Sequence, residues 1–309
     1  MIKGNELNHH HEKHYIKQYL LFNRLSSWLM NAIYSLYNNK IKTYIFVVTT
    51  GRSGSSSLNK IFDNVDDVAS FHEPYPIMLN PIKFNCKKNI YFKKLFKSKK
   101  RIYIKKECKD KEIYFESNHM FIKNFSDEIV TEFGNKVKVI YLVREPILVA
   151  KSFLAINSIP GKTETGITYL LTPEHEDNLI NLSGVTLPEN EIECDFCLCL
   201  WYWFEIQARA LAFHQKNPQI QFVTIRTEDL NDRIKISLLF GKLGLNIDST
   251  ILDKVVGIKE NSKVSEKNKF EKNSISESKM YELYDSIKKK LELVNGSDRI
   301  IEYKDIDAL

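Results

Sequence analysis

The feature that most constrains the fold is a glycine- and serine-rich loop between two apolar segments. The first segment, Tyr44–Val48, consists of β-branched and aromatic residues, which is typical of a buried strand. The loop, residues 49–58, reads Thr-Thr-Gly-Arg-Ser-Gly-Ser-Ser-Ser-Leu. Leu58, Ile61 and Phe62 then recur at the spacing of a helix. A strand, a tight loop and a helix are therefore expected in direct succession.

Similar alternation continues along the chain. Further strands are expected at 68–71, 113–115, 137–143 and 220–225, and helices at 125–133, from 146, at 194–215, 234–243 and 279–294. Strands alternating with helices predict a three-layer α/β/α domain of the P-loop NTPase-like class, with a mainly parallel central sheet. Ligands bind such sheets at the carboxyl ends of the strands, so functional residues are expected just after residues 48, 71, 115 and 143.

The loop at residues 49–58, here called the phosphate loop, has the composition of an anion-binding site. Its glycines permit tight turns in which successive N–H groups face an anion, and the following helix start adds partial positive charge. The arginine adds a guanidinium fork and the serines add hydroxyl donors. We predict a phosphate-binding cradle made by Thr50, Gly51, Arg52, Ser53, Gly54, Ser55, Ser56 and Ser57. The loop lacks the Gly-Lys-Ser/Thr ending of a nucleoside triphosphatase loop, and a serine-rich turn with a helix cap is the alternative.

A second anion-binding pair is expected after the strand at 137–143. Arg144 closes that strand, and Ser152 lies eight residues further on, in a helix that Pro146 begins. An arginine fork with a hydroxyl beside it suits a phosphate monoester. Pairing of Arg144 with a carboxylate is the alternative.

These segments, in this order, resemble the sulfotransferase family. The phosphate loop is similar to the family's 5′-phosphosulfate-binding loop, in the arginine form of the carbohydrate and tyrosylprotein sulfotransferases. The segment Arg144–Ser152 resembles the 3′-phosphate-binding motif. Phe71–Pro74 resembles the acidic motif that supplies a glutamate as catalytic base, and Phe222–Leu230 resembles the late strand and Glu-Asp-Leu turn of the family. The resemblance spans about residues 43–250.

The resemblance implies a reaction and a role for each matched residue. Residues 43–309 would be a sulfotransferase domain that moves a sulfuryl group from 3′-phosphoadenosine-5′-phosphosulfate (PAPS) to an acceptor hydroxyl and releases adenosine 3′,5′-bisphosphate (PAP), without a metal. Arg52 would sit beside the bridging oxygen of PAPS, while Arg144 and Ser152 would hold the 3′-phosphate. Glu73 would take the acceptor proton. The acceptor, whether glycan, lipid, peptide or small alcohol, is not encoded in any motif.

The chain departs from the family at one catalytic position. Cytosolic sulfotransferases carry a Lys-Thr-His motif where this chain reads Glu116–His119, without the lysine. The second cation on the transferring group is therefore open between His119 and Lys123. For the base, His72 and His119 are alternatives to Glu73. Two other functions also stay open: a phosphotransferase using the same loop, and a nucleotide-binding module without turnover.

Charge is distributed unevenly along the chain. The net charge is +6, but residues 81–112 hold twelve lysines and one arginine against three acids, so the remainder is mildly acidic. This basic insertion is interpreted as a solvated lysine-rich hairpin, in part helical around 91–96, with an acidic partner or anionic membrane as the alternative. No nucleic-acid partner is expected. The oligomeric state is not predicted.

Residues outside the matched region bear on location. Residues 1–42 are predicted to be an N-terminal extension in which 19–37 form an amphipathic helix, packed on the domain or lying on a membrane surface. No secretory signal is recognisable, and the five cysteines are an odd number without a disulfide pattern, so a cytoplasmic protein is expected, with peripheral membrane contact through 19–37 as the alternative. The cysteine cluster 194–199 and the aromatic run 201–203 are expected to be core residues, rather than metal ligands or a sugar platform.

Overall fold

The computed structural model describes residues 40–80, 88–108, 110–256 and 275–308. The N-terminal extension with its expected amphipathic helix at 19–37 lies almost wholly outside the described residues, as do the first part of the basic insertion, 81–87, and most of the connection expected at 258–276. No helix in the described ranges is both long and apolar enough to cross a membrane.

The sheet has five parallel strands in the described part of the chain. Their spatial order is β2-β3-β1-β4-β5. The strands are β1 (Thr43–Val48), β2 (Val68–His72), β3 (Ile113–Ser117), β4 (Val137–Val143) and β5 (Gln221–Arg226). Each lies within two residues of its predicted position. Because all five run in one direction, their carboxyl ends share one edge of the sheet, where the site residues were expected.

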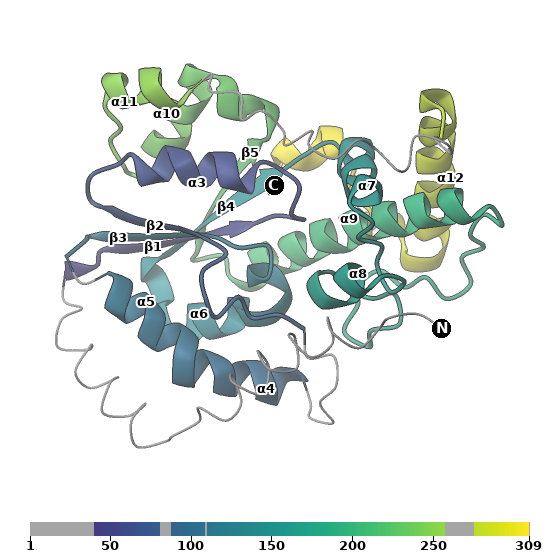
Figure 1. Ribbon diagram of the computed structural model, residues 1–309, viewed down its shortest axis with the longest axis horizontal. Helices are drawn as coiled ribbons and strands as arrows, with labels where there is room; N and C mark the ends of the chain where they lie inside the picture. Colours follow the sequence, from purple (N-terminus) through teal and green to yellow (C-terminus); the bar gives the residue numbers. More distant parts are fainter. Residues whose placement is uncertain (1–39, 81–87, 109, 257–274, 309) are drawn as a thin grey trace, which may run out of the picture.

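Helices cover both faces of the sheet (Figure 1). The period-two alternation of strand side chains divides the core, so that Ile45 and Val47 face one layer and Phe46 and Val48 the other. One layer holds α3 (Ser55–Asp63), α10 (Arg233–Lys242) and α11 (Ser249–Val255). The other includes α6 (Ser126–Phe133), α7 (Pro146–Ala155), α8 (Glu164–Tyr169), α9 (Glu191–Lys216) and α12 (Glu277–Asn295). The predicted three-layer α/β/α fold class is confirmed.

The described part of the basic insertion is helical, which corrects the expectation of a hairpin. It runs through α4 (Lys88–Leu95), a π-helical turn at Phe96–Lys100 and α5 (Arg101–Glu107). Apolar residues at helical spacing, among them Phe92, Leu95 and Phe96, pack into the core and explain the helix. A second π-helical turn, Phe121–Phe125, precedes α6. Short 3₁₀ helices lie at Gly134–Lys136, Glu228–Asn231, Ser297–Arg299 and Tyr303–Ala308.

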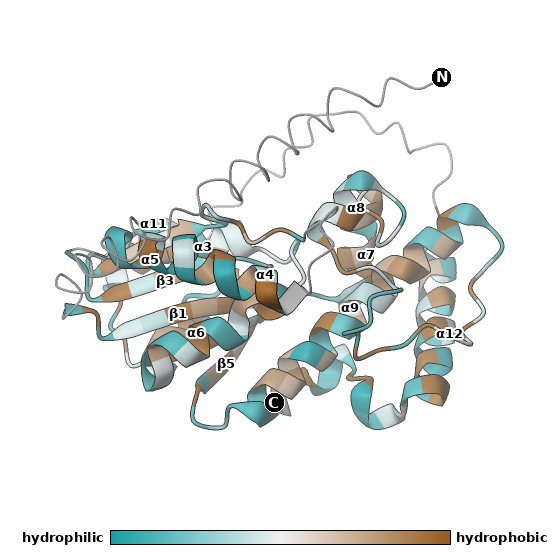
Figure 2. Cartoon of the chain, turned by 90° about the horizontal axis from the view of Figure 1, so that it is seen from below, coloured by the Kyte–Doolittle hydropathy of each residue, from teal (hydrophilic) through white to brown (hydrophobic). Residues whose placement is uncertain are grey.

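Helix α9 forms the centre of the second layer. Trp201, Tyr202 and Trp203 have no exposed surface, which confirms that they are core residues and not a sugar platform. Cys197 and Cys199 are buried on the same helix, and Cys194 is half-buried. Figure 2 shows the resulting pattern, in which the strands are largely apolar and α6 and α12 carry one apolar and one polar side.

Candidate active site

The phosphate loop turns back on itself through left-handed backbone conformations. Gly51, Arg52 and Gly54 have φ angles of 81°, 57° and 82°. At Gly54 a Cβ atom would also lie 3.1 Å from side-chain atoms of Leu230 and Thr227, so that position needs glycine both for its φ and for the space it leaves. The Glu-Asp-Leu turn recognised in the sequence thus packs directly on the phosphate loop.

Two of the predicted phosphate donors instead brace the loop from inside. Thr50 and Ser53 are buried, and their hydroxyls lie 2.8 Å apart. The Thr50 hydroxyl donates to the carbonyl of Gly51 at 2.7 Å, and the Ser53 hydroxyl lies 3.0 Å from the same carbonyl. We therefore assign these two side chains to the shape of the loop.

Donors from other elements bind two further carbonyls of the loop. The Tyr202 hydroxyl on α9 donates to the carbonyl of Thr50 at 3.0 Å, and the Thr227 hydroxyl donates to that of Ser53 at 2.8 Å. No sequence pattern indicates the Tyr202 contact, because an apolar helix shows only that its residues are buried. Since these carbonyls are already bonded, the loop offers an anion its N–H groups with few competing acceptors.

The start of helix α3 is open to an anion. Gly54 is its cap residue, no side chain at that position bonds the first N–H groups, and the first turn holds no acidic residue. Ser55, Ser56 and Ser57 form this turn, and their side chains are half-buried. A helix start without a side-chain cap carries partial positive charge, so it favours a negatively charged group.

The two predicted phosphate-binding segments meet at Arg52. Its Nε donates to Ser152 Oγ at 2.9 Å, across 100 residues of sequence, and Arg144 Nη1 donates to the Arg52 carbonyl at 2.7 Å. Trp203 Nε1 holds the Arg144 carbonyl at 2.9 Å. The neighbouring Glu145 carboxylate, for its part, caps α7. Burial, and then the charge of Arg52, lower the pKa of Arg144. A bound anion would offset this repulsion between the two guanidinium groups.

Glu73 leaves the sheet by a sharp turn. Its N–H donates to the Ser117 carbonyl at 3.0 Å, which continues the pairing of β2 with β3, and its φ is then 47°. His72 ends β2, and its Nδ1 lies 2.9 Å from Ser117 Oγ. Residues 72 and 73 therefore do not form one extended segment, because Glu73 is left-handed.

His119 links Glu73 to a buried lysine. His119 Nε2 lies 3.5 Å from Glu73 Oε1, and Lys123 Nζ lies 2.8 Å from His119 Nδ1. Burial, and then the charges of Lys123 and His72, hold the pKa of His119 well below its usual range. The ring of His119 also stands against the phosphate loop, since its Cγ is 3.6 Å from where a Cβ on Gly51 would be.

These contacts assign the proton on neutral His119. A lysine ammonium only donates, so His119 Nδ1 must accept and the ring proton is carried on Nε2, toward Glu73. His119 in this form presents its N–H toward the Glu73 carboxylate at 3.5 Å and is not a base. Lys123 Nζ also donates to the Tyr169 carbonyl at 2.6 Å and to the Tyr202 hydroxyl at 3.1 Å, which connects Glu73 through Tyr202 to the phosphate loop.

We expect the low pKa of His119 to make stability depend on pH. In the folded protein the ring stays neutral, whereas in the unfolded chain it takes a proton below pH of about 6.5. The contribution of His119 to the free energy of unfolding is therefore complete above that pH and declines as the pH falls. In urea unfolding, the free energy of unfolding of wild type should fall more than that of His119→Gln when the pH is lowered from 7.5 to 5.5. Parallel pH curves would contradict the assignment.

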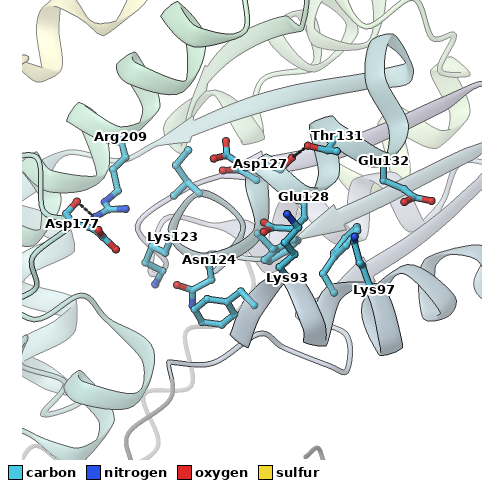
Figure 3. A pocket seen from close by; sticks show the side chains of 15 residues that line it. Lys93, Lys97, Lys123, Asn124, Asp127, Glu128, Thr131, Glu132, Asp177 and Arg209 are labelled. Atoms are coloured by element: carbon cyan, nitrogen blue, oxygen red, sulfur yellow. Dashed lines mark hydrogen bonds between the residues drawn. The ribbon is translucent and has the colours of Figure 1, made fainter. Parts of the chain in front are cut away.

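A cleft of about 590 Å³ opens on the side of the sheet that carries α4 and α6 (Figure 3). Lys93 and Lys97 line one wall, and Arg209 and Asp177 lie together at one end, where Arg209 donates to the Asp177 carbonyl at 2.7 Å. Of the residues assigned to the site, Lys123 alone lines this cleft within the described ranges. The described ranges also contain no group of three or more His, Cys, Asp or Glu placed to hold a metal ion.

No family model and no curated protein matches the chain. Sulfotransferases are among the solved structures to which it is similar. A sulfotransferase domain from the curacin biosynthetic pathway is 17% identical over 69% of this chain and 77% of that one, with a TM-score of 0.44. A sulfotransferase domain from the Synechococcus PCC 7002 olefin synthase is 12% identical over 81% and 96%, with a TM-score of 0.44.

Mouse sulfotransferase SULT7A1 complexed with PAP is a third similar structure. It is 15% identical over 72% of this chain and 66% of that one, with a TM-score of 0.38. Because these identities and TM-scores are low, the functional assignment below depends on the residues of this chain.

Proposed function

We propose that this protein is a sulfotransferase that moves a sulfuryl group from PAPS to an acceptor hydroxyl. The observation that carries the proposal is the junction at Arg52, where the phosphate loop after β1 and the Arg144/Ser152 pair after β4 meet by two hydrogen bonds. A donor with charged groups at both its 5′ and 3′ positions needs two anion sites close together. A single phosphate needs only one.

The donor nucleotide would be held by both segments. The N–H groups and hydroxyls of Ser55–Ser57 face the 5′-phosphate at the uncapped helix start. Arg144 and Ser152 bind the 3′-phosphate. The Arg52 side chain is exposed and lies between these two groups, so it can turn from Ser152 to the bridging oxygen that joins sulfate and phosphate.

Transfer then requires in-line attack and a place for one proton. The acceptor oxygen forms a bond to sulfur as the bond from sulfur to the bridging oxygen breaks, and Arg52 stabilises the charge that develops on the leaving oxygen. Glu73 accepts the proton of the acceptor hydroxyl. His119, neutral with its proton on Nε2, lies 3.5 Å from the Glu73 carboxylate and orients it, and Lys123 fixes that tautomer.

Nucleotide discrimination tests the first half of this proposal. We expect wild type to bind PAP more tightly than adenosine 5′-phosphate by about 10-fold to 100-fold, because a charge-assisted contact to the 3′-phosphate contributes on the order of 1.5–3 kcal/mol. Arg144→Ala should reduce this preference and leave the affinity for adenosine 5′-phosphate nearly unchanged. Calorimetric titration with both nucleotides measures it. Equal affinities in wild type would contradict the assignment of Arg144 and Ser152.

A further inference from the structure

One lysine of the basic insertion is buried in the core. Lys100 ends the π-helical turn and has no exposed surface, whereas Lys93, Lys94 and Lys97 on the same helical segment are exposed. Its Nζ lies 2.6 Å from Glu116 Oε1, and Glu116 is fully buried too. Burial lowers the pKa of Lys100 and the Glu116 charge opposes that shift. A buried ion pair of this kind needs further hydrogen bonds to be tolerated.

Those hydrogen bonds come from the strand that carries Glu116. The Tyr114 hydroxyl donates to Glu116 Oε2 at 2.6 Å, and Asn118 Nδ2 donates to Glu116 Oε1 at 2.9 Å. Asn118 Oδ1 in turn accepts from the N–H of Met120 at 2.9 Å. The carboxylate is thus bonded at both oxygens, and the network fixes the end of β3 and Asn118, which lies one residue before His119.

The same network reaches the segment that follows Glu73. Lys100 Nζ donates to the Pro74 carbonyl at 3.4 Å, and Asn118 Nδ2 lies 3.3 Å from the Ile77 carbonyl. This segment is strained, because Glu73 and Met78 both have left-handed φ angles, 47° and 68°, without being glycine. Such conformations persist only where surrounding contacts hold them, and they collect at functional sites.

We propose that the buried Lys100–Glu116 pair is a positioning element that holds the turn of Glu73 in place for proton transfer. Lys100 and Asn118 hold the backbone of the turn through the Pro74 and Ile77 carbonyls. His119, in contrast, contacts the Glu73 carboxylate itself. Part of the basic insertion thereby belongs to the catalytic architecture. The proposal rests on the proposed function only because it names Glu73 as the base. The contacts that hold the turn do not depend on which reaction the protein catalyses.

The test compares Lys100→Met with Lys94→Met, a matched change at an exposed lysine of α4. We expect Lys100→Met to lower kcat for sulfuryl transfer by on the order of 10-fold to 100-fold, because small displacements of a catalytic group have effects of that size. Its affinity for PAP should stay within about twofold of wild type, since the nucleotide segments follow β1 and β4. Lys94→Met should retain wild-type kcat.

A double-mutant cycle separates positioning from general damage. If Lys100 acts through Glu73, adding Lys100→Met to Glu73→Gln lowers the residual kcat no further, whereas a merely structural defect lowers it on both backgrounds alike. Should the single variant not fold, Lys100→Met/Glu116→Gln removes both charges and leaves no uncompensated one. The proposal is overturned if Glu73→Gln is impaired but a folded variant that lacks the Lys100–Glu116 pair retains wild-type kcat.

A second readout does not depend on turnover. Hydrogen exchange followed on peptides covering residues 73–80 should be faster in the variant lacking the pair than in Lys94→Met. Unchanged exchange there overturns the positioning proposal even if the protein proves not to be a sulfotransferase. Conversely, full turnover by Glu73→Gln contradicts the base assignment and leaves the exchange result standing.

Discussion

Glu73→Gln should lower the turnover of sulfuryl transfer by about 10²-fold or more and leave PAP affinity nearly unchanged. Glutamine keeps the size of the side chain, and its amide oxygen can still face the His119 Nε2–H, but it cannot take a proton from an acceptor hydroxyl. The left-handed turn at Glu73 is kept as well, so the loss reports the missing base. Steady-state transfer of labelled sulfate, with calorimetry for PAP, measures both quantities.

The control variants are the two neighbouring histidines. His72→Asn should have a milder effect, because the His72 ring bonds Ser117 and lies at the end of the strand. His119→Gln should be intermediate, since His119 orients the carboxylate without taking the proton. A larger loss for His72→Asn than for Glu73→Gln would make the histidine the base and contradict the assignment.

Arg52→Gly should abolish measurable transfer, a loss of at least about 10³-fold, without lowering the melting temperature. The guanidinium is the exposed cation between the two anion sites, so no core contact disappears with it. Glycine is the appropriate replacement because residue 52 has a φ of 57°. The carbonyl that accepts from Arg144 also remains in place.

Arg52→Ala is the matched variant for the backbone. It removes the same guanidinium but keeps the Cβ on a left-handed residue, which costs roughly 1–2 kcal/mol of stability relative to the glycine variant. We therefore expect the two variants to share the loss of transfer and to differ in melting temperature, with alanine the lower. Normal turnover in the folded glycine variant would remove Arg52 from the reaction.

The sequence was sufficient to predict those elements whose structure depends on residues close together in the chain. The strand Val137–Val143 and the helix from Pro146 agree with the structure because a buried apolar run and a proline at a helix start act within a few residues. The phosphate loop was recognisable for the same reason, since its glycines stand where the backbone is left-handed. Parallel topology then brought Arg52 and Ser152 together, as the strand order requires.

The parts that sequence reasoning missed depend on single polar atoms at the ends of buried side chains. Periodicity shows that Tyr202 is buried, but not that its hydroxyl reaches the Thr50 carbonyl 152 residues away. Likewise helical spacing places Lys100 on the same face as Phe96, but it does not show that the ammonium pairs with Glu116. The left-handed turn at Glu73 carries no glycine, so a sequence pattern could not indicate it.

Transfer of labelled sulfate from PAPS tests the central claim most directly. The full chain would be incubated with ³⁵S-labelled PAPS and a panel of glycans, lipids, peptides and small alcohols, and in parallel with ATP labelled at its γ-phosphate. We predict label on at least one hydroxyl-bearing acceptor from PAPS, lost in Arg52→Gly, and none from ATP. Transfer of phosphate from ATP with none of sulfate from PAPS would contradict the proposed function and favour a phosphotransferase.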